Sequence, residues 1–182
     1  MKNYVSLSIA FIASLMFCGC EPIEDWLAEH IGHTMLDFKN NSNYKVSVFS
    51  IAMPPYQCSN VNIYPDTSLP LQPPLSLIEI DDVEPYRSKV IIDISWKWEE
   101  VFEEFNTDTI PFFVIRTDSL NILGWDSIRM SYNILQRYDV SIEDVREILI
   151  RSDMTFPPSV EMKSIKMWPP YGTYDSSGQR IR

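Results

Sequence analysis

The chain has 182 residues, with 15 Lys and Arg against 25 Asp and Glu, and its net charge is −10. An acidic chain of this kind lacks the basic footprint that nucleic acids and anionic lipid headgroups require, which argues against both as ligands. Hydrophobic residues make up 45%, which is typical of a globular domain. The five glycines form no G-x-G-x-x-G or G-x-x-x-x-G-K-[ST] loop, so a phosphate cradle of either type is excluded.

The first twenty residues have the pattern of an export signal. Lys2 precedes Val5–Phe17, an uncharged stretch too short to span a membrane comfortably. The stretch ends in Cys18-Gly19-Cys20. A small residue directly before a cysteine resembles the lipobox of bacterial lipoproteins, and this resemblance implies cleavage after Gly19 and lipidation of Cys20. Cys18 is the alternative acceptor, and an ordinary signal is the alternative reading.

Removal of residues 1–19 leaves one domain-sized chain with a net charge of −11, because only Lys2 is lost. Residues 20–32 are predicted to be an acidic tether. If Cys18 is removed and Cys20 is acylated, Cys58 has no partner for an internal disulfide. The domain must then be stabilised by its hydrophobic core, and Cys58 is expected to be an inert thiol rather than a nucleophile.

The first predicted elements are strands. Thr34–Phe38 and Tyr44–Ile51 alternate apolar and polar residues, and the Asn-rich segment between them predicts a hairpin. Residues 53–88 are rich in proline and predict a long irregular excursion, with a short strand at Leu75–Ile80. Val90–Ile94 is predicted to be the next strand.

Helices are expected between residues 95 and 149. Trp98, Val101, Phe102 and Phe105 have the spacing of an amphipathic helix, and we expect Ser95 to cap it. Ile110–Ile115 is a nearly continuous apolar run, which predicts a buried strand. Asp118-Ser119 predicts a turn into Leu120–Leu123, and two short helices follow. Ser141 is expected to cap the second of them, with Asp144 completing a capping box.

Thr155–Pro157 and Val160–Trp168 are predicted to complete the sheet, the latter as an edge strand. The fold class is therefore predicted to be α+β, with an antiparallel β-sheet or sandwich and two or three short helices clustered between residues 95 and 149. We expect one globular domain over residues 33–168 and a polar disordered tail over residues 169–182.

Catalytic and metal-binding patterns are missing from the sequence. His30 and His33 are the two histidines, and no further ligands stand at zinc-site spacing, so no metal and no cofactor are predicted. The acidic runs Asp81-Asp82 and Glu99-Glu100 are interpreted as solvated surface, although a paired-carboxylate hydrolase is compatible with the composition. Aromatic residues make up 13%. Among them, Trp96 and Trp168 are the best candidates for exposed platforms that stack on sugars.

Several segments together resemble a family of small uncharacterised lipoproteins of the Bacteroidales. They are Asn40-Asn41-Ser42, Tyr64-Pro65-Asp66-Thr67, Thr117-Asp118-Ser119-Leu120, Trp125-Asp126-Ser127-Ile128, and Ile134–Asp139 with Ser141 and Glu143-Asp144. The resemblance covers roughly residues 34–158. It implies an envelope location and a fold, and it implies no activity.

These observations predict a non-enzymatic lipoprotein of the outer membrane, held in the membrane by lipid at Cys20, on either the periplasmic face or the cell surface. Its expected role is protein interaction or envelope structure. Two alternatives stay open. One is a glycan-binding accessory module, and the other is an acidic antagonist of a basic envelope toxin or hydrolase, steered by the negative charge.

Overall fold

The computed structural model divides the chain into a unit of residues 1–33 and a unit of residues 34–182. It describes residues 34–50, 69, 80–104 and 106–181. The predicted signal peptide and tether, Cys58, and most of the strand predicted at Leu75–Ile80 lie outside the described residues.

Five strands form a sheet in which every neighbouring pair is antiparallel. Its order is β3-β2-β5-β6-β8. The strands are β2 Val46–Ser50, β3 Asp81–Val83, β5 Thr109–Arg116, β6 Gln136–Ser141 and β8 Lys166–Trp168.

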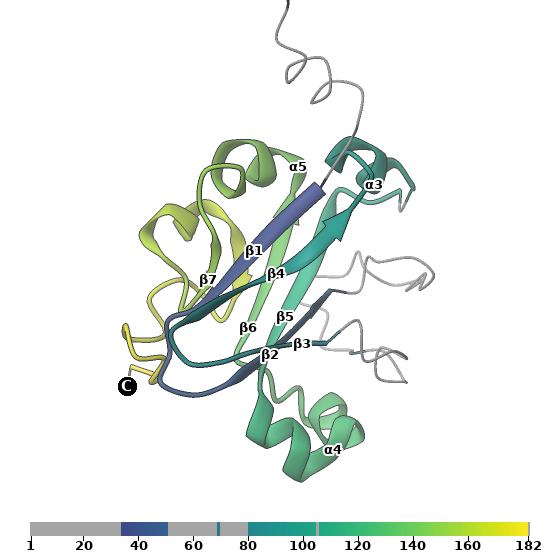
Figure 1. The fold of residues 1–182 in the computed structure, drawn as a ribbon. Helices are drawn as coiled ribbons and strands as arrows, with labels where there is room; N and C mark the ends of the chain where they lie inside the picture. The colour runs from purple at the N-terminus through teal and green to yellow at the C-terminus, as the bar shows by residue number, and fades with distance from the viewer. Residues whose placement is uncertain (1–33, 51–68, 70–79, 105, 182) are drawn as a thin grey trace, which may run out of the picture. The chain divides into compact units, whose positions relative to one another are not determined.

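A second sheet has three strands in the order β4-β1-β7. Strand β1 is Thr34–Asn40, β4 is Arg87–Ile94 and β7 is Met154–Phe156. The pairing of β1 with β4 is antiparallel, whereas that with β7 is parallel. Figure 1 shows β1 and β4 passing in front of β5 and β6, and residues of both sheets share one hydrophobic core. The two sheets therefore form a sandwich.

The helices lie between residues 95 and 149, as the sequence predicts, although the starts of two of them differ from the prediction. They are α3 Trp98–Glu104, α4 Thr117–Ser131 and α5 Ile142–Asp144, and α5 continues into a π-helical turn over Val145–Leu149. The predicted α+β class, with antiparallel-dominated sheets and short helices between residues 95 and 149, is thus confirmed. The Ser141 cap is also confirmed. Its hydroxyl accepts from Asp144 N, and the Asp144 carboxylate accepts from Ser141 N, a capping box that stabilises a helix by about 1 kcal/mol.

The principal core lies between the sheets. In β1, Leu36 and Phe38 are buried while Met35 and Lys39 are exposed, as expected for a strand with one face against a core. Strand β5 behaves differently because both of its faces are covered. Val114 packs in the principal core, whereas Phe113 and Ile115 pack in a second cluster with Trp125 and Ile128 of α4. Burial on both faces explains the continuous apolar run in β5.

The predicted first hairpin is wrong. Strands β1 and β2 have almost the expected bounds, yet they belong to different sheets. Residues 41–45 therefore cross from one layer of the sandwich to the other. The turn between β3 and β4 crosses back in the same way. Alternation predicts a strand with one buried face but does not determine which strand it pairs with.

Three further local predictions need correction. Helix α3 begins three residues after Ser95, and Lys97 N donates to the Glu100 carboxylate at its start. Helix α4 already begins at Thr117 and has a kink at Gly124, where φ is 73°, so no turn precedes residues 120–123. Strand β6 was not predicted. The first part of the strand predicted over residues 160–168 is a 3₁₀ helix, Val160–Ser164, and β8 alone is the edge strand.

The C-terminal segment does not match the prediction of a disordered tail or a domain end at residue 168. Within the described residues 169–181, Tyr174 forms a β-bridge with Arg180, and the Tyr174 hydroxyl donates to the Leu135 carbonyl. The Gly178 carbonyl accepts a hydrogen bond from the Tyr44 hydroxyl. A side chain at Gly178 would approach Ser42 Cβ to 2.6 Å. The segment therefore belongs to the folded unit.

Candidate functional site

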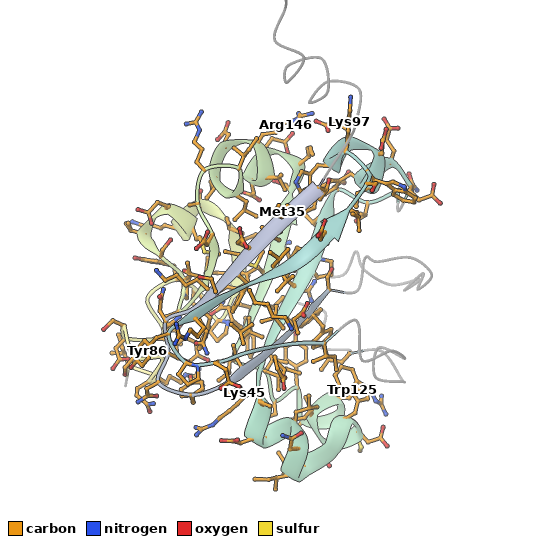
Figure 2. The ribbon with its side chains drawn as sticks, in the orientation of Figure 1. Met35, Lys45, Tyr86, Lys97, Trp125 and Arg146 are labelled. Carbon is orange, nitrogen blue, oxygen red and sulfur yellow. The ribbon has the colours of Figure 1, made fainter. Side chains whose placement is uncertain are left out.

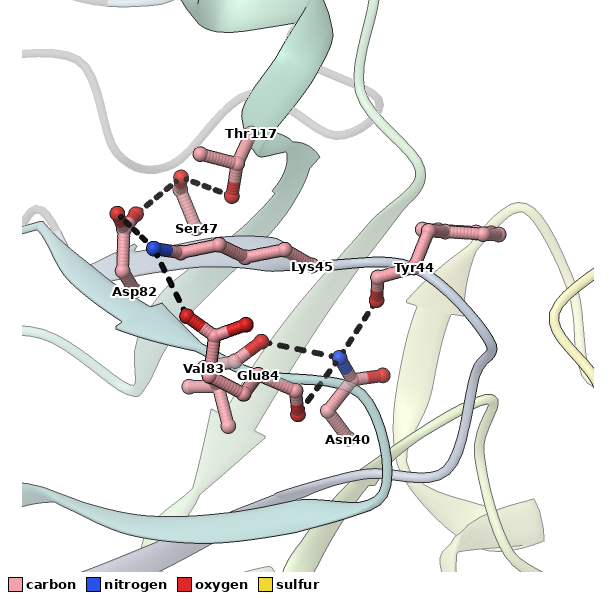
Figure 3. Close-up of polar contacts among 8 residues, drawn as sticks. All are labelled: Asn40, Tyr44, Lys45, Ser47, Asp82, Val83, Glu84 and Thr117. Atoms are coloured by element: carbon pink, nitrogen blue, oxygen red, sulfur yellow. Dashed lines mark hydrogen bonds and ion pairs between the residues drawn. The ribbon is translucent and has the colours of Figure 1, made fainter.

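The Asn40 side chain connects the two segments that cross between the sheets. Its amide nitrogen donates to the carbonyl of Tyr44 at 2.8 Å, of Val83 at 3.0 Å and of Glu84 at 3.2 Å (Figure 3). Its oxygen accepts from Ser42 N at 2.9 Å and from the Ser42 hydroxyl at 2.6 Å. Asn40 is fully buried. One amide thus satisfies several backbone groups that leave the regular ladders, and it holds both crossings in place.

Ion pairs and hydrogen bonds hold the acidic side chains of β3 and of the residue that follows it. Lys45 Nζ lies 3.1 Å from both Asp82 Oδ2 and Glu84 Oε1 (Figure 3). The Ser47 hydroxyl donates to Asp82 at 2.7 Å and lies 2.9 Å from the Thr117 hydroxyl. Hydrogen bonds to Asp82 and Glu84 raise the pKa of Lys45. Lys89 Nζ lies 2.7 Å from Asp81 Oδ1, so both carboxylates of the acidic run of β3 are counter-ions of lysines.

The turn that follows β3 is tight. Arg87 N donates to the Glu84 carbonyl at 3.2 Å, and Tyr86 at the tip has a φ of 58°. The Tyr86 side chain is 62% exposed. The Asn40 and Lys45 contacts precede the tip directly, so the turn is held in one position.

A buried ion pair lies on the α4 face of the five-stranded sheet. Arg137 Nε is 2.7 Å from Asp139 Oδ1, and the two side chains are 4% and 1% exposed. The guanidinium carbon lies 5.5 Å from the centre of the Phe113 ring. Asp139 Oδ2 has no hydrogen-bond partner within the part of the chain that the structure describes.

The charge of Arg137 is stabilised by its neighbours. Burial lowers the pKa of Arg137, but side-chain hydrogen bonds to Asp139 and Tyr132 outweigh this effect, and the pKa is raised. The Tyr132 ring packs on Trp168 with a centroid distance of 5.3 Å. Both residues of the pair alternate with buried apolar residues along β6, so the pair joins the sheet to the end of α4.

Three tyrosine side chains in or against the principal core donate hydrogen bonds from their hydroxyls to backbone carbonyls. Tyr44 donates to Gly178 at 2.6 Å, Tyr138 to Thr155 at 2.7 Å and Tyr174 to Leu135 at 2.6 Å. Burial raises the pKa of Tyr44 to about 12, and Tyr174 adds to the rise while Arg116 opposes it. Burial also raises the pKa values of Tyr138 and Tyr174.

These tyrosines predict a loss of stability at alkaline pH. The unfolded chain releases phenolic protons near pH 10, whereas folded Tyr44 retains its proton until about pH 12. The folded state therefore binds more protons in this window, and the free energy of unfolding must fall as the pH rises through it. Below pH 10 the contribution is complete. Urea unfolding at pH 8, 10 and 11 measures the effect, and Tyr44→Phe should make the decline shallower. An equally steep decline in the variant would show that Tyr44 is not involved.

The two predicted sugar-stacking tryptophans are not brought together. Trp96 is 40% exposed and follows β4 of the three-stranded sheet, where its carbonyl accepts from the Thr34 hydroxyl. Trp168 lies in β8 of the other sheet and is partly buried against Tyr132 and the second cluster. They do not form one platform.

The predicted absence of a metal site has only a partial test, because His30 and His33 lie outside the described residues. No group of three or more His, Cys, Asp or Glu that could hold a metal ion is found in the described ranges. The acidic residues of α3 are exposed, and Glu99 pairs with Arg146 at 2.6 Å.

Sequence reasoning missed the Asn40 network and the Arg137–Asp139 pair. The sequence places Asn40 in a predicted turn, and the residue type gives no sign of carbonyl partners more than 40 positions away. The signal for β6 in the sequence is the alternation of the polar residues Arg137 and Asp139 with Tyr138 and Val140. This alternation does not show that Arg137 and Asp139 are themselves buried.

Comparison with protein-family models, with curated proteins and with solved structures gave no match to this chain. Among the described residues, no helix has the length and apolar character needed to cross a membrane.

Proposed function

We propose that the protein is a lipid-anchored component of the outer membrane that binds another protein through the folded unit Thr34–Arg182. The observation that carries the anchor is the sequence Gly19-Cys20 directly after an uncharged export segment. Residues 21–33 separate the cysteine from the folded unit, so a fully extended connection would span at most roughly 50 Å. The predicted resemblance to Bacteroidales lipoproteins is part of this proposal.

Protein binding is favoured by the way in which the surface is built. The Asn40 amide and the Lys45 ion pairs hold the turn between β3 and β4 in one position. A fixed surface binds with less loss of conformational entropy than a mobile one. We therefore propose that this end of the sandwich is a recognition surface, and that the protein acts by binding rather than by catalysis.

The second candidate, an antagonist of a basic toxin or hydrolase, is supported by the exposed acidic residues of neighbouring helices. They are Glu99, Glu100, Glu103 and Glu104 of α3, with Glu143 and Glu147 of α5 and the π-helical turn. Their field would speed association with a basic partner, and the binding rate would fall as salt increases.

Chemical crosslinking on intact cells that make the full chain tests these candidates. Recovery of one protein in a stoichiometric complex would support the proposal, and a basic partner with salt-sensitive binding would favour the antagonist. Retention on envelope polysaccharide that is lost with Trp96→Ala or Trp168→Ala would favour a glycan module instead. Turnover of a glycoside that is abolished by a single Asp or Glu substitution would contradict the non-enzymatic role.

A further inference from the structure

Tyr86 adopts a backbone conformation that its residue type disfavours. Its φ of 58° lies in the left-handed region, where a Cβ atom crowds the following carbonyl. Pro85 directly precedes Tyr86 in the turn, and a hydrogen bond from Arg87 N to the Glu84 carbonyl closes the turn. The position after proline in such a turn favours glycine or asparagine, which adopt this conformation at little cost. A tyrosine at this place therefore needs a reason.

The other positive-φ residues have reasons inside the molecule. Three residues other than glycine have a positive φ in the described part of the chain, namely Asn106, Tyr132 and Tyr86. Asparagine tolerates the conformation. The Tyr132 ring packs on Trp168, and the Tyr132 side chain forms a hydrogen bond with Arg137. In contrast, the Tyr86 ring is 62% exposed, and no hydrogen bond, ion pair or ring contact involves its side chain within the described residues.

The structure also holds the backbone that leads into this residue in place. Asn40 binds the carbonyls of Val83 and Glu84, and Lys45 binds the carboxylate of Glu84. Figure 2 shows Tyr86 at the margin of the folded unit, on the side where β3 passes into β4. Arg87, the next residue, is exposed, and no ion pair to it is found in the ranges that the structure describes.

We propose that Tyr86 is the anchor residue of the protein-binding surface and that it inserts into an apolar pocket on the partner protein. The inference rests on the proposed function and names the contact that would perform it. Tyrosine and arginine dominate the binding energy of many interfaces, and a residue on a turn whose backbone is already fixed loses less entropy on binding than one on a mobile loop. The pocket carries a carboxylate on its rim in this proposal, because Arg87 is exposed beside the ring and would complement a negative charge there.

Tyr86→Gly separates binding from folding. Glycine adopts a φ of 58° without strain, so the variant should melt at the same temperature as the natural chain or higher. In the intact-cell crosslinking experiment, this variant should recover at least tenfold less of the partner, whereas Tyr86→Phe should recover nearly as much as the natural chain. Tyr171→Ala is the matched control, because Tyr171 is an exposed tyrosine of the C-terminal segment, and it should leave recovery unchanged.

The full chain with a benzoylphenylalanine photoprobe in place of Tyr86 tests directly whether this position contacts the partner. Illumination of intact cells should attach the probe to the same protein that chemical crosslinking recovers. If the natural chain and Tyr86→Gly recover that protein equally, the anchor assignment is wrong and the proposed function stands. A lower melting temperature for Tyr86→Gly, or a loss of polysaccharide retention in this variant, would also overturn the assignment. If the natural chain recovers no protein, the proposed function itself fails.

Discussion

We expect Asp139→Ala to lower the free energy of unfolding by about 3–5 kcal/mol, as removal of one partner of a buried ion pair does. The substitution leaves the guanidinium of Arg137 without its counter-ion, although the Arg137 side chain is only 4% exposed. It also removes one of the two partners, Asp139 and Tyr132, whose contacts together outweigh the desolvation of Arg137. Guanidinium-induced unfolding of the purified chain at pH 7 measures the change.

Two controls distinguish the loss of the pair from a general effect of removing an aspartate. Asp126→Ala, on the exposed face of α4, should change stability by no more than about 0.5 kcal/mol. The double variant Arg137→Met with Asp139→Leu should recover most of the loss, because well-packed apolar residues often replace a buried pair at no cost. The unpartnered Asp139 Oδ2 strengthens this expectation, since that oxygen is desolvated without compensation among the described residues. A loss below about 1 kcal/mol for Asp139→Ala would contradict the burial of the pair.

Asn40→Asp is expected to cost at least about 3 kcal/mol at pH 7, although the two side chains have the same shape. The Asn40 amide nitrogen donates to three carbonyls, and a carboxylate would place a negative oxygen against the same three acceptors. The site is fully buried, so the new charge would have no solvent to stabilise it.

The loss in Asn40→Asp should diminish as the pH falls. A buried carboxyl among acceptors has a raised pKa, and its protonated form again provides one donor. Asn43→Asp, at an exposed position of the same crossing segment, is the matched control and should stay within about 0.5 kcal/mol of the natural chain. Equal effects of the two substitutions would refute the role assigned to Asn40.

Local patterns predicted the elements whose stabilising partners are close in sequence. The Ser141 capping box, the apolar run of β5 and the spacing of Val101 and Phe102 in α3 are of this kind. These patterns predict a helix cap, a strand covered on both faces and an amphipathic helix, respectively, and the structure contains all three. The fold class followed from them.

Features decided by distant partners could not be predicted in this way. Strands β1 and β2 look like a hairpin, yet Asn40 binds carbonyls on the β3–β4 turn and stabilises a crossing between layers. The polar residues of β6 are buried because they pair with each other and with the end of α4. The C-terminal segment is polar, but hydrogen bonds to remote positions hold it in the folded unit. Tyr44 donates to the Gly178 carbonyl of this segment, and Tyr174 of the segment donates to the Leu135 carbonyl.

We propose that lipid at Cys20 anchors the protein to the membrane. Metabolic labelling with radioactive palmitate, applied to cells that make the natural chain, Cys18→Ser or Cys20→Ser, tests it most directly. We expect label in the natural chain and in Cys18→Ser, and none in Cys20→Ser, because Cys20 follows a small residue whereas Cys18 follows Phe17. Label that persists in Cys20→Ser and disappears in Cys18→Ser would move the anchor to Cys18, and a natural chain without label would contradict lipid anchoring altogether.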